Sequence, residues 1–250
     1  MALNKRQITI SIVSHYQEKL IKHLLDDLEN FCNKFITVII TINIEEKFFL
    51  NKKYSFPIFF VKNINPKGYG SNHNYAFMKC STKYFCVANP DIRLNSNPFA
   101  SLTKEIELYS AALISPMVIN EMGDIEESVR KYPSISSLFL KFLNIKKEFI
   151  YNKSNLIINP DWVGGMFMLF NTEQYRTIGG FDERYFLYCE DVDICRSLLK
   201  SGNSIIYSPN ASVIHSARRS SHKNIRYFLW HLTSFFRFFI KWNFLKKIVK

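Results

Sequence analysis

The chain has 250 residues, of which 47% are hydrophobic and 16% aromatic, so it is long enough for one substantial domain and short for two. It carries a formal net charge of +12 and has no uncharged apolar run of about 18 residues, which argues against a bilayer-spanning segment. Its five cysteines form no CxxC pair, and an odd number without a signal peptide predicts reduced thiols in a cytoplasm.

The first half alternates short apolar runs with helical patterns. Strands are expected at residues 8–13, 35–42, 57–61 and 84–88, and helices at 17–31 and 72–80. Continuous apolar strands alternating with helices predict an α/β fold, a mostly parallel Rossmann-like sheet with helices on both faces. Ligands of such sheets bind at the carboxyl ends of the strands.

The second half begins with a less regular stretch, residues 123–159, which contains an amphipathic piece at 136–143. Strands are expected again at 162–170 and 204–207, and a helix from Ile225 onward. In that helix one face is apolar and the other polar. The apolar face contains Phe228, Leu232, Phe235, Phe239 and Trp242, and the polar face contains Arg226, Ser234, Arg237 and Lys241.

The charge is distributed unevenly. Beyond Asp193 there is no Asp or Glu, whereas the same stretch contains 11 Lys and Arg residues. Such asymmetry predicts an anionic partner, which is nucleic acid, phosphate groups or an anionic membrane surface. We therefore divide the chain into a domain at 1–217 and a basic aromatic helical tail at 218–250.

The segment 178–196 gathers acids between large aromatic residues. The acids are Asp182, Glu183, Glu190, Asp191 and Asp193. Partial burial raises the pKa of a carboxylate and makes it a usable base near neutral pH. The alternative is a surface helix start, where acids collect at the positive end of the helix dipole.

Two further groups are expected at strand ends. Asp91, in Asn89-Pro90-Asp91, follows the fourth strand, where a carboxylate can hold a divalent metal or a ribose hydroxyl, although this tripeptide is also a strong turn signal. His215 can ligate a metal, and Arg218 and Arg219 can clamp a diphosphate, although a lone histidine is more often structural.

Two glycine pairs are also candidates. Gly68 and Gly70 open a helix, where they allow close approach of the backbone to an anion or a sugar, or simply form a turn. Gly164 and Gly165 follow Trp162, which offers a platform for a sugar ring or packs in the core.

In sequence order, the segments ITISIVSHY, KGYGSNHNYA, NPDI, WVGGMFML, IGGFDERYFLYCEDVDIC and VIH resemble family 2 glycosyltransferases of the GT-A fold. Among them the chain is similar to bacterial rhamnosyltransferases of O-antigen assembly. The resemblance implies inverting transfer of L-rhamnose from dTDP-L-rhamnose to an undecaprenyl-diphosphate-linked saccharide. It places the protein in lipopolysaccharide or other surface polysaccharide synthesis, peripheral on the inner face of the bacterial cell membrane.

The resemblance also assigns roles to individual residues. Asp191, beside Glu190, corresponds to the catalytic base, and Asp91 and His215 correspond to ligands of a divalent cation, Mg²⁺ or Mn²⁺. The donor side comprises Asn43, Gly68, Asn74, Asn89, Asp91, Arg218 and Arg219, and the acceptor side comprises Trp162, Gly164 and Gly165. Asn43 replaces an acid that relatives use for the nucleobase or ribose, and Ser197 replaces an arginine.

The tail then has a specific interpretation, in which its apolar stripe enters the membrane interface and its cations meet anionic headgroups. The alternative is packing on the domain or on a second subunit in a homodimer. Two other functions compete: transfer of GlcNAc, Gal or Galf by the same mechanism, or a non-catalytic protein that binds a membrane or nucleic acid. The latter leaves Asp91, Glu190 and Asp191 without a purpose, because acids in a cleft repel phosphates, so no nucleic-acid partner is expected.

Overall fold

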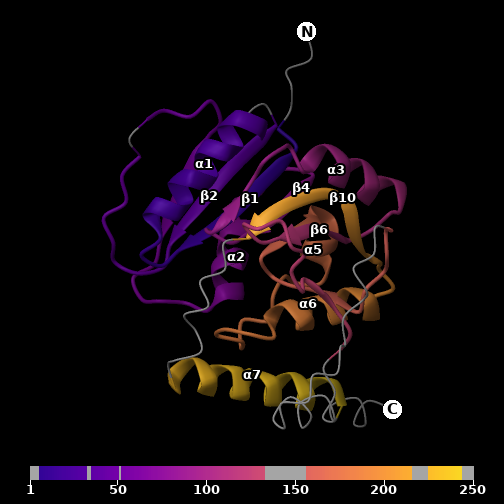
Figure 1. Cartoon of the computed structure of the whole chain (residues 1–250). Helices are drawn as coiled ribbons and strands as arrows, with labels where there is room; N and C mark the ends of the chain where they lie inside the picture. The colour runs from indigo at the N-terminus through magenta and orange to yellow at the C-terminus, as the bar shows by residue number, and fades with distance from the viewer. Residues whose placement is uncertain (1–5, 33–34, 51, 133–155, 216–224, 244–250) are drawn as a thin grey trace.

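The computed structural model describes residues 6–32, 35–50, 52–132, 156–215 and 225–243. A central sheet lies between two layers of helices, and a final long helix forms a further layer at the bottom of Figure 1. The expected amphipathic piece at 136–143 lies outside the described residues, as do Arg218 and Arg219.

The N-terminal half of the sheet is parallel and follows the predicted runs to within one residue. It consists of β1 (Ile8–Ser14), β2 (Ile36–Ile42), β3 (Ile58–Lys62) and β4 (Tyr84–Ala88), arranged as β3-β2-β1-β4. β1, β2 and β4 are buried nearly throughout. Buried β-branched side chains of this kind favour strands that are covered on both faces.

The rest of the sheet is mixed. β9 (Phe167–Asn171) lies antiparallel between β4 and β6 (Leu113–Ile119), β10 (Ile205–His215) runs parallel to β6, and β5 (Ile92–Arg93) ends the eight-stranded sheet. The predicted mostly parallel α/β sheet is confirmed, since the antiparallel pairs all involve β9 or the short β5.

Two predicted strand boundaries are wrong. The run 162–170 divides into β8 (Trp162–Val163) and β9, because the chain turns at Gly164 and β8 pairs instead with β7 (Val129–Arg130) in a separate ribbon. The run 204–207 continues to His215 as β10, past a register shift between Ser208 and Ser212. A bulge of this kind lets a strand continue through an interruption in its apolar pattern.

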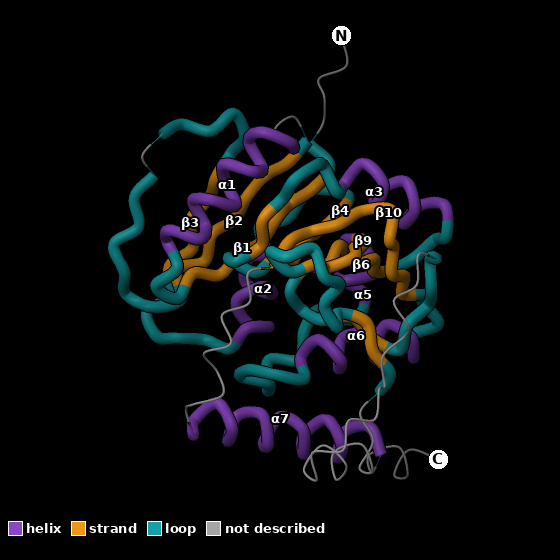
Figure 2. The backbone as a smooth tube through the Cα atoms, in the orientation of Figure 1, coloured by secondary structure: helices purple, strands orange, loops and turns teal. Residues whose placement is uncertain are grey.

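Helices cover both faces of the sheet (Figure 2). On one face, α1 (Glu18–Cys32) and α3 (Phe99–Leu108) share a core with the strands through Leu24, Leu25 and Leu102. The opposite face carries α2 (Tyr69–Phe77), α5 (Thr172–Thr177) and α6 (Glu190–Lys200). The second helix thus begins three residues before the predicted start.

The tail helix α7 (Ile225–Asn243) forms as predicted, but its inward face differs. Ser234, Phe235, Phe238 and Trp242 are buried, whereas Phe228 and Leu232 of the expected apolar stripe are exposed. Both polar and apolar contacts with the domain determine which face of α7 turns inward. Among the described residues, no helix is long and apolar enough to cross a membrane.

Candidate active site

Glu190 and Asp191 begin α6 after an unusual backbone segment. The two preceding residues, Tyr188 and Cys189, adopt left-handed conformations with φ of 72° and 64°. This conformation costs a residue other than glycine about 1–2 kcal/mol, so it persists only where the surroundings impose it. The strained pair fixes the direction in which the two acids leave the loop.

Asp191 is held by backbone donors. The N–H of Val192 donates to its Oδ1 over 2.8 Å, and the N–H of Gly165 donates to its Oδ2 over 3.1 Å. Burial raises the pKa of Asp191 above its ordinary value, although these two N–H groups and the charge of Arg130 oppose the shift. Asp191 is therefore a fixed carboxylate with enhanced proton affinity.

Glu190 lies beside it with even less compensation. The residue is 6% exposed, and its Oε2 has no hydrogen-bond partner among the residues that the structure describes. Burial, followed by repulsion from Asp191, raises the pKa of Glu190 to about 8. The two carboxyls form a buried pair that resists losing its last proton.

Two other acids of the segment, Asp182 and Asp193, face α7 and are paired. Lys241 Nζ lies 2.9 Å from Asp182 and 2.7 Å from Asp193, and Trp242 Nε1 donates to Asp193 over 2.7 Å. Burial opposes ionisation of Asp182, but hydrogen bonds from Arg184 and Lys241 outweigh it and lower its pKa. Attraction between Lys241 and these two acids turns this part of the predicted polar face of α7 toward the domain. The expectation that Lys241 points toward lipid headgroups is therefore wrong.

Asp91 and His215 converge as the sequence predicts. Asp91 follows β4 and His215 ends β10, and Asp91 Oδ1 lies 3.5 Å from His215 Nε2. The Oδ1 atom is buried and makes no hydrogen bond within the described part of the chain. On the other side of the ring, Glu126 Oε2 lies 2.8 Å from His215 Nδ1. Burial opposes protonation of His215, but Asp91 and Glu126 raise its pKa.

This arrangement fits a divalent cation that also binds a substrate. A buried carboxylate oxygen without a partner faces an imidazole nitrogen whose ring is oriented by a second carboxylate, as in many metal sites. Among the described residues, no three His, Cys, Asp or Glu side chains form a ligand cluster.

Tyr69 joins the two halves of the site. Its hydroxyl lies 2.7 Å from the carbonyl of Gly165 and 3.1 Å from Asn89 Oδ1, and so connects the support of Asp191 to the turn that carries Asp91. Burial, with the charges of Glu190, Asp191 and Asp91, raises its pKa well above the ordinary value, so Tyr69 remains a hydrogen-bond donor.

Two residues that were expected to contact the nucleotide sugar, Asn74 and Gly68, contact protein groups in the structure. Asn74 donates to Phe181 O and Glu183 Oε1 and accepts from Phe181 N and Tyr175 Oη, which uses all its hydrogen-bonding groups. A Cβ on Gly68 would lie 2.8 Å from the carbonyl oxygens of two residues, 185 and 186, so the absence of a side chain here accommodates protein backbone.

Asn43 is also largely occupied. Its Oδ1 accepts from Lys67 N and Asn63 Nδ2, each over 2.8 Å, and its Nδ2 donates to Lys67 O over 3.1 Å. One amide hydrogen remains for a ligand. The Asn43 side chain therefore mainly stabilises the turn before α2. It can offer a nucleotide sugar one further hydrogen bond.

On the other side of Asp191, Trp162 is half-buried and donates from Nε1 to Lys131 O over 2.9 Å. The guanidinium of Arg130 lies 5.3 Å from its ring centre. Gly165 contacts Asp191, whereas a Cβ on Gly164 would meet the flexible side chain of Met166. Trp162 thus packs against the core while part of its surface remains exposed, and its role as a platform for a sugar ring stays a prediction.

The chain is 29% identical over 247 residues to the rhamnosyltransferase WbbL of Escherichia coli K12, covering 92% of each chain. It is 28% identical over 145 residues to N-acetylglucosaminyl-diphospho-decaprenol L-rhamnosyltransferase of Mycobacterium tuberculosis, over 54% of this chain and 47% of that one. The structure of GalNAc-T7 with UDP, GalNAc and Mn²⁺ matches with a TM-score of 0.72 and 14% identity, over 96% of this chain and 49% of that one. This chain thus spans about half the length of the last two. No family model matches it.

The chain is a glycosyltransferase of the GT-A fold. The resemblance to family 2 enzymes is thereby confirmed at the level of fold and enzyme class. Three residues that act on Asp191, Asp91 or His215 were not predicted from the sequence: Tyr69, Glu126 and Arg130. Tyr69 could have been predicted, because it lies between the two glycines of the predicted turn. Glu126 and Arg130 lie in an irregular segment whose sequence shows no pattern that points to them.

The raised pKa of Glu190 predicts a stability that depends on pH. A carboxyl whose pKa is higher in the folded state stabilises the protein at low pH, and this contribution is lost as pH rises through the folded pKa. Glu190→Gln should therefore raise the free energy of unfolding by about 1–3 kcal/mol at pH 9 and by little at pH 5, measured by urea denaturation. The exposed Glu183→Gln is the control. Equal effects at both pH values would show that burial of the charge is not the cause.

Proposed function

We propose that the chain is an inverting glycosyltransferase that moves L-rhamnose from dTDP-L-rhamnose to a lipid-diphosphate-linked saccharide in O-antigen or other surface polysaccharide synthesis. The observation that carries the proposal is Asp191, a carboxylate of raised pKa fixed by two backbone N–H groups and linked through Tyr69 to the turn that carries Asp91. The names of the two rhamnosyltransferase relatives support the sugar, and one of these names includes a prenyl-diphosphate acceptor.

Asp191 acts as the base. Inversion requires that a base take the proton of the acceptor hydroxyl while that oxygen bonds to the anomeric carbon and the bond to the diphosphate breaks on the opposite side. The backbone donors of Val192 and Gly165 fix both oxygens of Asp191 and leave a lone pair on each for the hydroxyl. Burial raises the proton affinity of Asp191, and repulsion from Asp191 in turn raises that of the neighbouring Glu190.

Asp91 and His215 form the leaving-group side. A divalent cation, Mg²⁺ or Mn²⁺, held there would supply positive charge to the departing diphosphate. Arg218 and Arg219 follow His215 by three and four residues in the sequence, and we assign them to the same diphosphate. Asn89 accepts from Tyr69 at the start of this turn and so positions the Asp91 backbone relative to the base.

The acceptor side is formed by Trp162, Gly164 and Gly165. Gly165 contacts both Asp191 and Tyr69, so an acceptor hydroxyl near the base lies against this turn. The apolar face of a sugar ring packs on an indole, and Arg130, which lies over Trp162, offers a cation to an acceptor diphosphate.

We also propose that α7 holds the enzyme on the membrane, where a lipid-linked acceptor resides. Its outer face carries exposed apolar side chains at helical spacing: Ile225, Phe228, Leu229, Leu232, Phe236 and Ile240. The sequence supplies Arg218, Arg219 and Lys223 before this helix and Lys246, Lys247 and Lys250 after it. An apolar face flanked by cations suits an anionic bilayer surface.

Asp191→Asn tests the base. It should lower transfer about 10²–10⁴-fold while leaving donor affinity near normal, because the amide cannot take a proton. Rates are measured with dTDP-L-rhamnose and a GlcNAc-diphospho-prenyl acceptor, and the anomeric configuration of the product by NMR. Asp124→Asn, at an exposed loop, is the control. Normal turnover by the Asp191 variant would remove Asp191 from the mechanism.

The same assay, with UDP-GlcNAc, UDP-Gal and UDP-Galf as competing donors, tests the sugar. Preference for one of these would replace rhamnose while keeping the mechanism. Absence of transfer from every donor, with intact binding to vesicles, would favour the non-catalytic membrane-binding alternative.

Asp91→Asn and His215→Gln test the cation. Each should weaken Mn²⁺ binding in the presence of dTDP at least ~10-fold, because removing one of two protein ligands exceeds the effect of losing an outer-shell partner. Binding is followed by electron paramagnetic resonance of free Mn²⁺, and a chelator should abolish transfer by the unmodified enzyme. Mn²⁺ affinity that is unchanged in both variants would refute this site.

Leu232→Gln combined with Phe236→Gln tests the membrane face. Each buried apolar side chain contributes about 1.5–3 kcal/mol, so binding to anionic liposomes should fall at least ~100-fold. Phe59→Gln with Ile64→Gln, which changes two exposed apolar residues near the opposite edge of the sheet, is the matched control. Similar losses in both double variants would argue against a specific membrane face.

A further inference from the structure

The segment 184–189, here called the base loop, leads directly into Glu190 and Asp191. It ends in the two left-handed residues Tyr188 and Cys189, whose conformation its own sequence does not favour. Contacts from elsewhere must therefore hold it. The described residues provide them from two sides, α2 and α7.

On the α2 side, the loop closes over the turn at Gly68. The N–H of Tyr69 donates to the carbonyl of Phe186 over 2.9 Å. The absence of a side chain at Gly68 allows this approach. This contact ties the base loop to Tyr69, the residue that connects the two halves of the active site.

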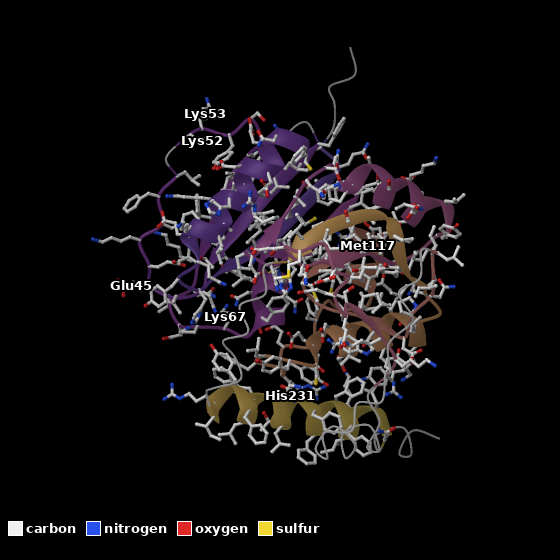
Figure 3. The ribbon with its side chains drawn as sticks, in the orientation of Figure 1. Glu45, Lys52, Lys53, Lys67, Met117 and His231 are labelled. Atoms are coloured by element: carbon white, nitrogen blue, oxygen red, sulfur yellow. The ribbon has the colours of Figure 1, made fainter. Side chains whose placement is uncertain are left out.

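On the other side, α7 contacts the base loop along the first half of the helix. Ser234, which is 2% exposed, donates from Oγ to the carbonyl of Leu187 over 2.8 Å. The ring of Trp230 lies 4.8 Å from that of Phe186, and the ring of His231 lies 5.1 Å from that of Tyr188. Figure 3 labels His231 on α7. These contacts reach the first residue of the strained pair and the two residues before it.

The second half of α7 holds the other end of the same structure. Lys241 and Trp242 both bind Asp193, which is 1% exposed and lies two residues after Asp191. Tyr185, at the start of the base loop, also approaches Asp193, with its hydroxyl 3.2 Å from Oδ1. The helix thus contacts the chain on both sides of the base.

We propose that α7 is a clamp that positions the catalytic base: its inner face holds the base loop and the start of α6 in the strained conformation that presents Asp191 to the acceptor. Ser234 and Trp242 are positioning residues, because they act on the loop and on Asp193 rather than on substrate. The inference rests on the proposed function, since it takes Asp191 as the base. It also makes the tail an integral part of the active site rather than a separable membrane anchor.

Ser234→Ala and Trp242→Phe test the clamp in the full-length enzyme. Each removes one hydrogen-bond donor and keeps most of the packing. Each should lower kcat about 10-fold and leave the KM for the nucleotide sugar nearly unchanged. A small displacement of the base slows proton transfer strongly but changes the binding of the nucleotide sugar little. Hydrogen exchange of the backbone amides at 186–191 should accelerate, while amides of β1 and β4 keep their protection.

Thr233→Ala is the matched control. It removes a hydroxyl from the adjacent residue, which is exposed and bonds only to carbonyls of its own helix at Leu229 and Trp230. It should leave kcat and the exchange pattern unchanged. Unchanged kcat and exchange in the Ser234 and Trp242 variants would overturn the clamp, as would a loss of kcat accompanied by faster exchange throughout the sheet, since that pattern indicates a general loss of stability.

Asp191→Asn separates this inference from the function on which it rests. Retained transfer by that variant would reject Asp191 as the base, whatever α7 does. An inactive Asp191→Asn, together with Ser234→Ala and Trp242→Phe enzymes of normal kcat and exchange, would preserve the proposed function and reject the clamp alone.

Discussion

Burying a carboxylate without a cation is unfavourable, and this constraint organises the second half of the molecule. At the start of α6, Asp193 faces α7, where Lys241 and Trp242 satisfy it, whereas no cation among the described residues forms an ion pair with Glu190 or Asp191. Positions 191 and 193 are about 200° apart around a helix of 3.6 residues per turn. The first turn of α6 therefore directs Asp193 toward α7, where it stabilises the fold, and directs Asp191 to another side, where its raised proton affinity suits a base.

The site depends on a small number of contacts between segments that are distant in the sequence. Tyr69 bonds to the turn of Asn89 and to Gly165, and Gly165 in turn supports Asp191. Because Tyr69 is buried among three carboxylates, its proton is retained and its hydroxyl remains a donor. A displacement of the turn before α2 is thus transmitted to the base and to Asp91 together. This coupling matters for transfer, because the base and the leaving group must lie on opposite sides of one carbon atom.

The sequence predicts what depends on local pattern and strand ends. Apolar runs gave β1 to β4 within one residue, and Asp91 and His215 meet because both end strands at the same edge. The antiparallel insertion of β9 between β4 and β6 was not predictable in this way, since strand order results from long-range packing. Asn74 was misassigned because the same turn chemistry serves a ligand or a neighbouring loop, and only the structure shows that the loop occupies it.

Helix α7 shows why amphipathic periodicity alone did not give its orientation. The helix carries large apolar residues around most of its circumference, so several stripes fit the same spacing. The choice is made by Asp182 and Asp193, which bind Lys241, and by Leu187 O, which accepts from Ser234. These contacts are largely shielded from solvent, so salt screens them less than it screens surface charges. A bilayer would contact only the outer face of α7 and would leave these contacts of the inner face intact. The helix can therefore bind a membrane while it continues to hold the base loop.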